Sequence, residues 1–322
     1  MVRLDYFKRL WKETEWISKL TGKSRLFFLL DGIHAGLIHG SDVSAYAKDG
    51  LWKQPSFFRR LEVTQKRNGR AIHHFNDKKH IYLLLNKAAF NKHFSIVVNR
   101  DWLLVKEVSF KSFYEFLKKH SCCFVKPING MQGIGVLRII SSEYVGREKE
   151  LYNDLVSKNM LIEDAIVAHP DMNFGGKAVN TIRMYTLLDR KGDVHHIKAI
   201  LRASTGESHL DNFHGGGIIY EVDLATGVVC SKGRSITSLE EDIIVQPNTD
   251  IVMVGRKIPN WNIVLQKSSI AAKLIPECRY IGWDIAITNE GVEFIEGNHD
   301  ADHVLLNTPG SRCHWKDFLK YW

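Results

Sequence analysis

The sequence predicts an α+β fold built around a mostly antiparallel sheet. Helical periodicity dominates the first part of the chain, whereas strand-like apolar segments dominate after residue 180. A helix-like segment at 261–274 interrupts these strands, so helices and strands do not alternate regularly as they do in a parallel α/β sheet. We expect strands at 181–189, 194–202, 217–223, 280–287 and 292–297.

The N-terminal half should be mainly helical, with a smaller β unit near its end. Residues 3–20 and 77–92 repeat apolar residues at helical spacing, and Asp77 is a candidate N-cap for the second segment. Between them, the sequence reads as irregular chain or short helices. Further along, we expect a strand at 94–98, helices at 109–120 and near 143–157, and strands at 122–126, 136–140 and 159–163.

The composition is that of a globular protein without a membrane span. Of the 322 residues, 44% are hydrophobic and 25% are charged, which is ordinary for such proteins. No apolar run reaches the roughly 18–20 residues that a membrane span requires, and the start lacks a signal-peptide pattern. The five cysteines are odd in number and lack C-x-x-C spacing, which favours reduced thiols. We therefore expect a cytoplasmic location.

Positive charge is concentrated in the N-terminal third. Residues 1–120 contain 23 Lys and Arg against 11 Asp and Glu, a net charge of +12, whereas the remainder has 21 basic and 25 acidic residues, a net charge of −4. Such an excess can attract phosphates, acidic glycans, nucleic acid or an anionic membrane. For the amphipathic segment 3–20 we favour docking on the core, and peripheral membrane contact stays open as the alternative. No nucleic-acid recognition module is visible, so nucleic acid is not an expected partner.

The most informative segment is a predicted hairpin near the C-terminus. Asp284 lies on its first strand, and Glu296 and Asn298 lie on its second. Residues two apart on a strand point to the same face, so Glu296 and Asn298 project together and the hairpin can place Asp284 beside them. Two carboxylates and an amide oxygen suit Mg²⁺, which also binds nucleotide phosphates. A solvated acidic face is the alternative interpretation.

A second segment has the features of a phosphate-binding flap. Lys126 ends a predicted strand, the glycine-rich run 129–135 follows, and a second strand returns. Glycines let backbone N–H groups approach phosphate oxygens, and the lysine adds positive charge. An ordinary glycine-rich hairpin is the alternative. The next apolar strand ends in Glu163 and Asp164, where a carboxylate and backbone groups can meet an adenine edge.

These motifs occur in an order that resembles ATP-grasp enzymes and, more narrowly, the sugar-transfer-associated ATP-grasp family. The narrower resemblance rests on four segments: V-N-T-I-R at 179–183, D-N-F-H-G-G-G at 211–217, P-N-W at 259–261 and G-W-D at 282–284. The resemblance covers about residues 75–307. It implies a fold in which two α+β subdomains sandwich MgATP. We expect a basic, mainly helical region at 1–76 and an ATP-grasp domain at 77–322, divided into a lid at about 120–165 and a large subdomain at about 166–322.

The resemblance also implies which residues bind nucleotide and metal. Lys126 would lie near the phosphates, and one or two Mg²⁺ ions would be held by Asp284, Glu296 and Asn298. Lys198 shares a strand face with Arg202 and joins the expected nucleotide contacts. These expected contacts are Lys78, Lys126, Asn129, Gly130, Gln132, Gly133, Gly135, Glu163, Asp164, Ile166 and Lys198.

The chain departs from many ATP-grasp ligases at Gly282, where those enzymes carry an arginine before the first metal-binding aspartate. The cation that stabilises the transition state must then come from elsewhere, and Arg183 and Arg202 are the candidates. A surface salt bridge is the alternative for each. His214 can act as acid, base or phosphate donor in a glycine-rich loop. The expected substrate contacts are Asp211, Asn212, Gly215, Gly216 and His299.

The implied reaction is an ATP-dependent carboxylate–amine ligation through an acyl phosphate. The family name suggests that an amino acid is joined to a uronic-acid sugar or a related precursor in surface-polysaccharide biosynthesis. The expected partners are a small carboxylate and an amine, including a sugar nucleotide or a lipid-linked sugar. A kinase acting on a sugar or lipid-linked hydroxyl and a nucleotide-binding module without catalysis are the alternatives.

Overall fold

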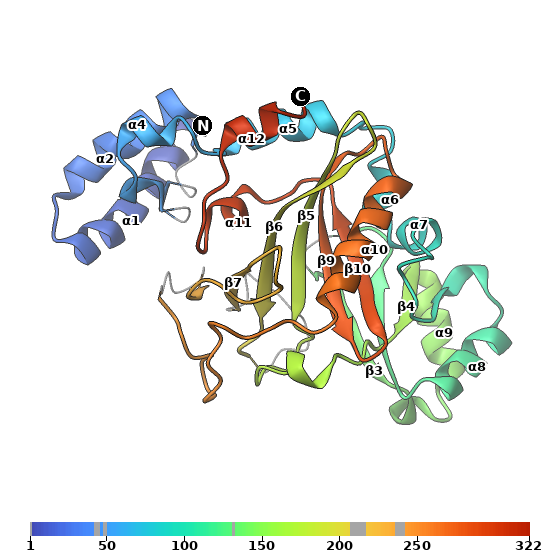
Figure 1. The fold of residues 1–322 in the computed structure, drawn as a ribbon. Helices are drawn as coiled ribbons and strands as arrows, with labels where there is room; N and C mark the ends of the chain where they lie inside the picture. The colour runs from blue at the N-terminus through green and yellow to red at the C-terminus, as the bar shows by residue number, and fades with distance from the viewer. Residues whose placement is uncertain (1, 42–45, 48–49, 131–132, 207–216, 236–241) are drawn as a thin grey trace.

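The computed structural model describes residues 2–41, 46–47, 50–130, 133–206, 217–235 and 242–322 (Figure 1). Two antiparallel sheets organise this part of the chain, which confirms the predicted α+β class. The larger sheet has the strand order β10–β9–β5–β6–β7–β8, and the smaller has the order β1–β4–β2–β3. The larger sheet consists of β5 (Thr181–Leu188), β6 (Val194–Ala203), β7 (Ile218–Val222), β8 (Arg234–Ser235), β9 (Tyr280–Thr288) and β10 (Gly291–Asn298). The smaller sheet consists of β1 (Trp102–Leu104), β2 (Cys122–Pro127), β3 (Leu137–Ile140) and β4 (Met160–Asp164).

The two faces of the larger sheet have different coverings. Helix α10 (Trp261–Leu274) packs on one face, where alternate strand residues such as Met184, Leu201 and Trp283 form the main apolar core. Part of the opposite face is covered by α5 (Gln65–Phe75), α11 (His303–Asn307) and α12 (Trp315–Leu319). The rest of that opposite face carries charged side chains, and it is where the candidate site lies.

The smaller sheet also has one apolar and one polar face. Helices α8 (Phe110–Lys119) and α9 (Glu148–Ser157) cover the face that presents Val125 and Ile162, with the 3₁₀ turn Val105–Glu107 beside them. Alternation then places Lys126 and Glu163 on the other face.

A β-bulge sets the orientation of the last strand. Phe294 pairs with Ile285 and Glu296 pairs with Asp284, so Ile295 is an extra residue on β10. Without it, Glu296 would share the apolar face with Phe294, because residues two apart on a regular strand project together. The bulge instead turns Glu296 toward Asp284.

The N-terminal region forms its own helical unit, seen in blue in Figure 1. It contains α1 (Val2–Thr21), α2 (Arg25–His34), the π-helical segment η1 (Ala35–His39), the 3₁₀ turn η2 (Leu51–Lys53) and α4 (Ser56–Arg59). Leu10 and Ile17 of α1 pack with Phe28 of α2 in a separate small core, so α1 docks within this unit rather than on the main core, while Trp11 is exposed. Within the described residues, no helix is both long enough and apolar enough to span a membrane.

Most of the expected elements are confirmed to within a few residues, and two are wrong. The helix expected at 77–92 is divided into α6 (Tyr82–Leu85) and α7 (Lys87–His93). Asp77 accepts a bond from the backbone of Lys79 in a turn rather than starting a helix, whereas Asn86 caps α7 by accepting from Ala89.

The strand expected at 94–98 is a turn. The buried apolar residues there follow α7 without pairing in a ladder, and the next strand along the chain is β1. The helix expected near 143–157 begins at Glu148, after the 3₁₀ turn Ser141–Tyr144.

Candidate functional site

Asp284 lies at the centre of a buried charged cluster on the larger sheet. It is the direct strand partner of Arg183, which binds both of its carboxylate oxygens, with Nη2 at 2.9 Å from Oδ2. Nη1 of Arg202, on β6, also lies 2.9 Å from Oδ2. Burial alone would raise the pKa of Asp284, but these two guanidinium groups hold it well below its usual range. The aspartate is therefore ionised and held in a fixed orientation.

Glu296 is the second carboxyl group of this cluster, and its pKa is shifted in the opposite direction to that of Asp284. Burial raises the pKa of Glu296, and the negative charge of Asp284 raises it further. Nδ2 of Asn298 lies 3.3 Å from Oε1 of Glu296 and 3.3 Å from the carbonyl oxygen of Gly282. The structure thus brings together the three residues predicted as metal ligands, and the cluster contains one carboxyl group that holds its proton readily.

The donor set fits a divalent cation bound mainly through Glu296. A carboxylate offers about four lone-pair positions, and three on Asp284 already accept bonds from Arg183 and Arg202. The fourth accepts a hydrogen bond from the carboxyl group of Glu296, so a cation would have to replace that proton and bind through Glu296 and the amide oxygen of Asn298. Within the described residues there is no cluster of three or more His, Cys, Asp or Glu side chains of the metal-binding kind. A cation here would therefore depend on water and phosphate oxygens for its remaining ligands.

Gly282 explains how Arg183 reaches this position. A Cβ atom on Gly282 would lie 3.1 Å from Cδ of Arg183, which is closer than most real Cβ contacts. The position at which many ATP-grasp ligases carry an arginine thus has no side chain here, and Arg183 of the neighbouring strand lies against it. Arg183 and Arg202 are salt-bridged, but both bridges are buried and end on Asp284, so they are not surface pairs.

On the smaller sheet, Lys126 and Glu163 form an ion pair on the face opposite α8 and α9. Glu163 is almost fully buried and also accepts from Nη2 of Arg100 at 2.8 Å and Nδ2 of Asn91 at 2.9 Å. Burial would raise the pKa of Glu163, but Arg100 and Lys126 lower it strongly. Arg100 also binds Glu293 of β10 at 2.5 Å, so this network ties the smaller sheet to the larger one.

Lys87, at the start of α7, connects the two charged groups. Its ammonium donates to the carbonyl oxygen of Gly130 at 2.8 Å, which anchors the beginning of the glycine loop. Its pKa is lowered, chiefly by burial, and its charge also interacts with those of Glu296, Lys126 and Glu163. Lys87 is therefore near enough to both charged groups for its charge to interact with each, although no sequence motif marks it. The only available signal was its place beside the cap residue of α7.

Several predicted nucleotide contacts are placed away from this centre. Asp164 projects from the opposite face of β4 to Glu163 and pairs with His120 at 3.1 Å. Lys198 is buried and donates to the carbonyl oxygens of Leu306 at 3.3 Å and Pro309 at 3.0 Å, so its ammonium anchors the C-terminal segment. Lys78 is exposed in the turn before α6. For these side chains the structure gives no contact with the Asp284 cluster among the described residues.

The remaining predicted residues divide between the loop ends and segments outside the described structure. Asn129 contacts Asn86 at 3.3 Å, and Gly130, Gly133 and Gly135 all have positive φ, as expected for a loop that turns its backbone sharply. Ile166 and His299 are half-buried. The residues Gln132, Asp211, Asn212, His214, Gly215 and Gly216 lie outside the described residues.

The family of the chain follows from a match over most of its length. The model of the sugar-transfer-associated ATP-grasp family matches residues 60–312, and the chain therefore belongs to that family. This match confirms the resemblance and the ATP-grasp class that the motif order predicted. No curated protein matches the chain.

Solved ATP-grasp structures resemble it at low identity. The ATP-grasp ligase PsnB, in a complex with a phosphomimetic precursor variant, Mg and ADP, is 13% identical over 71% of this chain and 54% of PsnB, with a TM-score of 0.41. D-cycloserine synthetase DcsG is 12% identical over 84% of this chain and 77% of its own, with a TM-score of 0.43. D-alanyl-alanine synthetase A from Vibrio cholerae is 12% identical over 74% of this chain and 63% of its own, with a TM-score of 0.44. This chain spans about half the length of PsnB.

Proposed function

We propose that the protein is an ATP-dependent carboxylate–amine ligase that uses Mg²⁺. One observation carries the proposal: Glu296 is the strand partner of Asp284, which two buried arginines bind, and the ammonium groups of Lys87 and Lys126 lie on the neighbouring helix and sheet. Cationic side chains for phosphates and oxygen ligands for a metal are thereby gathered from both sheets. Membership in an ATP-grasp family supports the same chemistry. The need for ATP supports a cytoplasmic setting.

In the first step, a carboxylate oxygen of the substrate attacks the γ-phosphorus of ATP and the bond to the bridging oxygen breaks. ADP leaves, and an acyl phosphate forms. Lys126 and Lys87 are suited to hold phosphate oxygens, and Arg183 and Arg202 to stabilise negative charge on the transferred group. When bound, Mg²⁺ offsets phosphate charge, and the residues that would hold it are Glu296, Asn298 and Asp284.

In the second step, the amine nitrogen attacks the acyl carbon. Phosphate leaves with the electrons of the carbon–oxygen bond, the nitrogen loses a proton, and an amide remains. We propose that the acceptor carboxylate belongs to a uronic-acid sugar or a related precursor and that the amine is an amino acid. The description of the family as associated with sugar transfer supports this substrate class and a role in surface-polysaccharide biosynthesis.

The test combines a nucleotide assay with product masses. Purified protein is incubated with MgATP, uronic-acid sugar nucleotides and a pool of amino acids, and ADP, free phosphate and product mass are measured together. A ligase releases phosphate and yields an amide whose mass is the sum of both substrates less water. A product that instead gains a phosphate group identifies a kinase. Binding of MgATP without turnover of any pair contradicts the ligase and supports a nucleotide-binding module.

A further inference from the structure

Helix α2 and the π-helical segment η1 that continues it are apolar on two opposite sides. One side, which includes Phe28, Gly32 and Ala35, is buried in the small N-terminal core. The other side exposes five large apolar side chains whose exposed fractions run from 53% at Phe27 to 79% at Leu37. We call these residues the α2 stripe: Leu26, Phe27, Leu30, Leu37 and Ile38.

An exposed apolar stripe of this length is unusual for a helix at a protein surface. Such a helix normally places polar residues on its solvent side, and a helix that is apolar all round is normally buried by something. The buried side of α2 already packs into the small N-terminal core, so the stripe is apolar surface that this core does not need. Its position on the blue helical unit, away from both sheets in Figure 1, also separates it from the candidate site.

The exposed charges of the N-terminal helical unit are of one sign. Among the described side chains of residues 1–60, every exposed charged residue is basic: Lys8, Lys12, Lys19, Lys23, Lys53 and Arg60. Two acidic residues in the same unit are paired. Glu15 contacts Lys19 at 2.9 Å and Arg25 at 3.4 Å, and Asp31 binds Arg59 at 2.7 Å. The surface of this unit therefore combines exposed apolar side chains with an excess of exposed basic ones.

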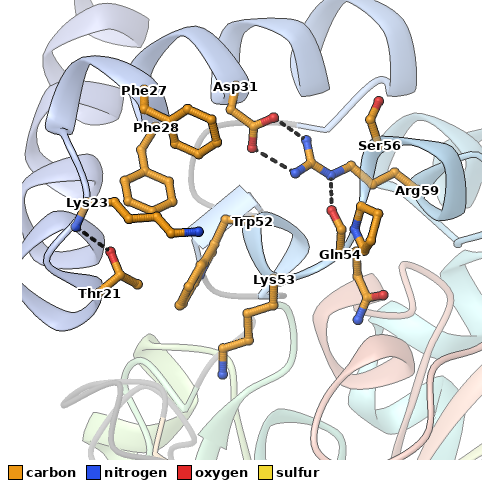
Figure 2. A pocket seen from close by; sticks show the side chains of 11 residues that line it. Thr21, Lys23, Phe27, Phe28, Asp31, Trp52, Lys53, Gln54, Ser56 and Arg59 are labelled. Atoms are coloured by element: carbon orange, nitrogen blue, oxygen red, sulfur yellow. Dashed lines mark hydrogen bonds and ion pairs between the residues drawn. The ribbon is translucent and has the colours of Figure 1, made fainter.

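A pocket of about 410 Å³ lies beside the start of the stripe. Figure 2 shows Lys23 and Lys53 beside the rings of Phe28 and Trp52, while Asp31 is held by the guanidinium of Arg59. Phe27 belongs both to the stripe and to the pocket lining. The ammonium of Lys23 lies 5.9 Å from the ring centroid of Phe27, and that of Lys53 lies 5.3 Å from the ring centroid of Trp52. Apolar rings with ammonium groups at their edge suit a phosphate-bearing headgroup with hydrocarbon next to it.

We propose that the α2 stripe is a docking surface for an anionic lipid membrane. The stripe lies at the boundary of the acyl chains, and the surrounding lysines meet the lipid phosphates, with one headgroup in the pocket. Charge complementarity favours this partner over a second copy of the chain. A two-fold symmetric dimer through the stripe would bring the same basic residues face to face. The inference does not depend on the ligase reaction.

Vesicle sedimentation tests the apolar part of the proposal. The full chain is mixed with vesicles of neutral phosphatidylcholine, or with vesicles in which about a third of the lipid is phosphatidylglycerol. We expect binding to the anionic vesicles, and the double variant Leu30→Asp with Leu37→Asp should lower the partition coefficient roughly tenfold or more. Val145 and Val167 are each 75% exposed and lie outside the N-terminal unit, so Val145→Asp with Val167→Asp is the matched control.

A charge variant tests the basic part. Lys12→Ala with Lys23→Ala should weaken binding to the anionic vesicles, and binding of the unmodified chain should fall as salt rises. Circular dichroism checks that each variant keeps its helices. The proposal is overturned if the chain ignores both kinds of vesicle, or if stripe and control variants lose binding equally. It is also overturned if sedimentation velocity shows a dimer that the stripe variant dissolves while vesicle binding is absent.

Discussion

Two buried clusters of guanidinium and carboxylate groups lie along the same face of β10, yet they differ in electrostatic state. In the first, Arg100 binds Glu163 and Glu293, and the pKa of Glu163 is strongly lowered. In the second, Arg183 and Arg202 both bind Asp284, while burial and the neighbouring aspartate raise the pKa of Glu296. In the first cluster Arg100 is shared by both acids and Lys126 adds a second cation at Glu163, whereas the other cluster concentrates its cations on one of two acids.

The difference separates a structural connection from a binding site. In the Arg100 cluster the charges are matched by short contacts, so an added ligand would have to displace them. In the Asp284 cluster, Glu296 would gain from a divalent cation, because the cation would replace a proton that the buried carboxyl group otherwise holds. We therefore interpret the first cluster as the link between the sheets and the second as the place where metal and phosphate would bind.

The largest expected effect comes from breaking the first cluster. Arg100→Met leaves Glu163 and Glu293 buried without their shared cation, and we expect the free energy of unfolding to fall by about 3–5 kcal/mol. Urea denaturation measures this. Lys158→Ala removes an exposed pair with Asp154 and should cost less than about 1 kcal/mol. Equal losses in the two variants would show that Arg100 is not a structural link.

Glu296→Gln should lower activity while leaving stability unchanged, which is the reverse of the effect expected for Arg100→Met. It removes a carboxylate from the metal-type cluster, so turnover of ATP should fall by roughly 10²–10³-fold, as for the loss of one preorganised electrostatic contact. Stability at neutral pH should not fall, because the variant also removes a buried acid whose ionisation is unfavourable. Turnover assays and urea denaturation on the same preparation give both values. A variant that loses stability but keeps turnover would reverse our assignment of the two clusters.

A smaller effect is expected from Gly282→Ala. The added Cβ would press on Cδ of Arg183 and shift its guanidinium by a few tenths of an ångström, so we expect turnover to fall roughly tenfold. Gly69→Ala is the control, since a Cβ there meets nothing within 4 Å. Unchanged turnover in Gly282→Ala would mean that the position of Arg183 is not critical.

The smallest effect is a pH dependence of stability. The raised pKa of Glu296 stabilises the folded chain fully below the ordinary value of 4.5, and this contribution is lost as pH rises through the folded-state pKa. Stability of the unmodified chain relative to Glu296→Gln should therefore decline with rising pH, by at most about 1.4 kcal/mol per pH unit. Glu163 has a lowered pKa and acts in the opposite direction, so its contribution is lost as pH falls. Denaturation series over a range of pH measure the difference, and a flat difference would argue that Glu296 is not coupled to Asp284.

Local sequence patterns were sufficient for most of the strands, though not for β1, β8 or the segment 94–98, and for the hairpin that carries Asp284, Glu296 and Asn298. Strand alternation was incomplete for Glu163 and Asp164: it places them on opposite faces of β4, but it does not show which of those faces α8 and α9 cover. It was also incomplete for Glu296, whose orientation depends on the bulge at Ile295. These features depend on which strands pair and in what register, and a single sequence does not contain that information.

The cationic residues of the two clusters were still harder to predict from the sequence. Arg183 and Arg202 were found because they lie near recognisable motifs. Lys87 and Arg100 lie in segments with no motif. The packing of α7 and of the chain before β1 against β10 brings Lys87 to the candidate site and Arg100 to the link between the sheets. Contacts between residues so far apart in the chain arise from tertiary packing, which leaves no periodic signal in the sequence.

The bulge at Ile295 has a consequence for how this family can vary. It absorbs one extra residue between Glu293 and Glu296 while both keep facing the same side of the sheet. A single-residue deletion at this point would shorten the interval between the two acids but would leave each on its original face. We therefore expect relatives of this chain to tolerate the deletion of one residue between Glu293 and Glu296. A one-residue deletion elsewhere in β10 would instead turn an acidic side chain toward the apolar core.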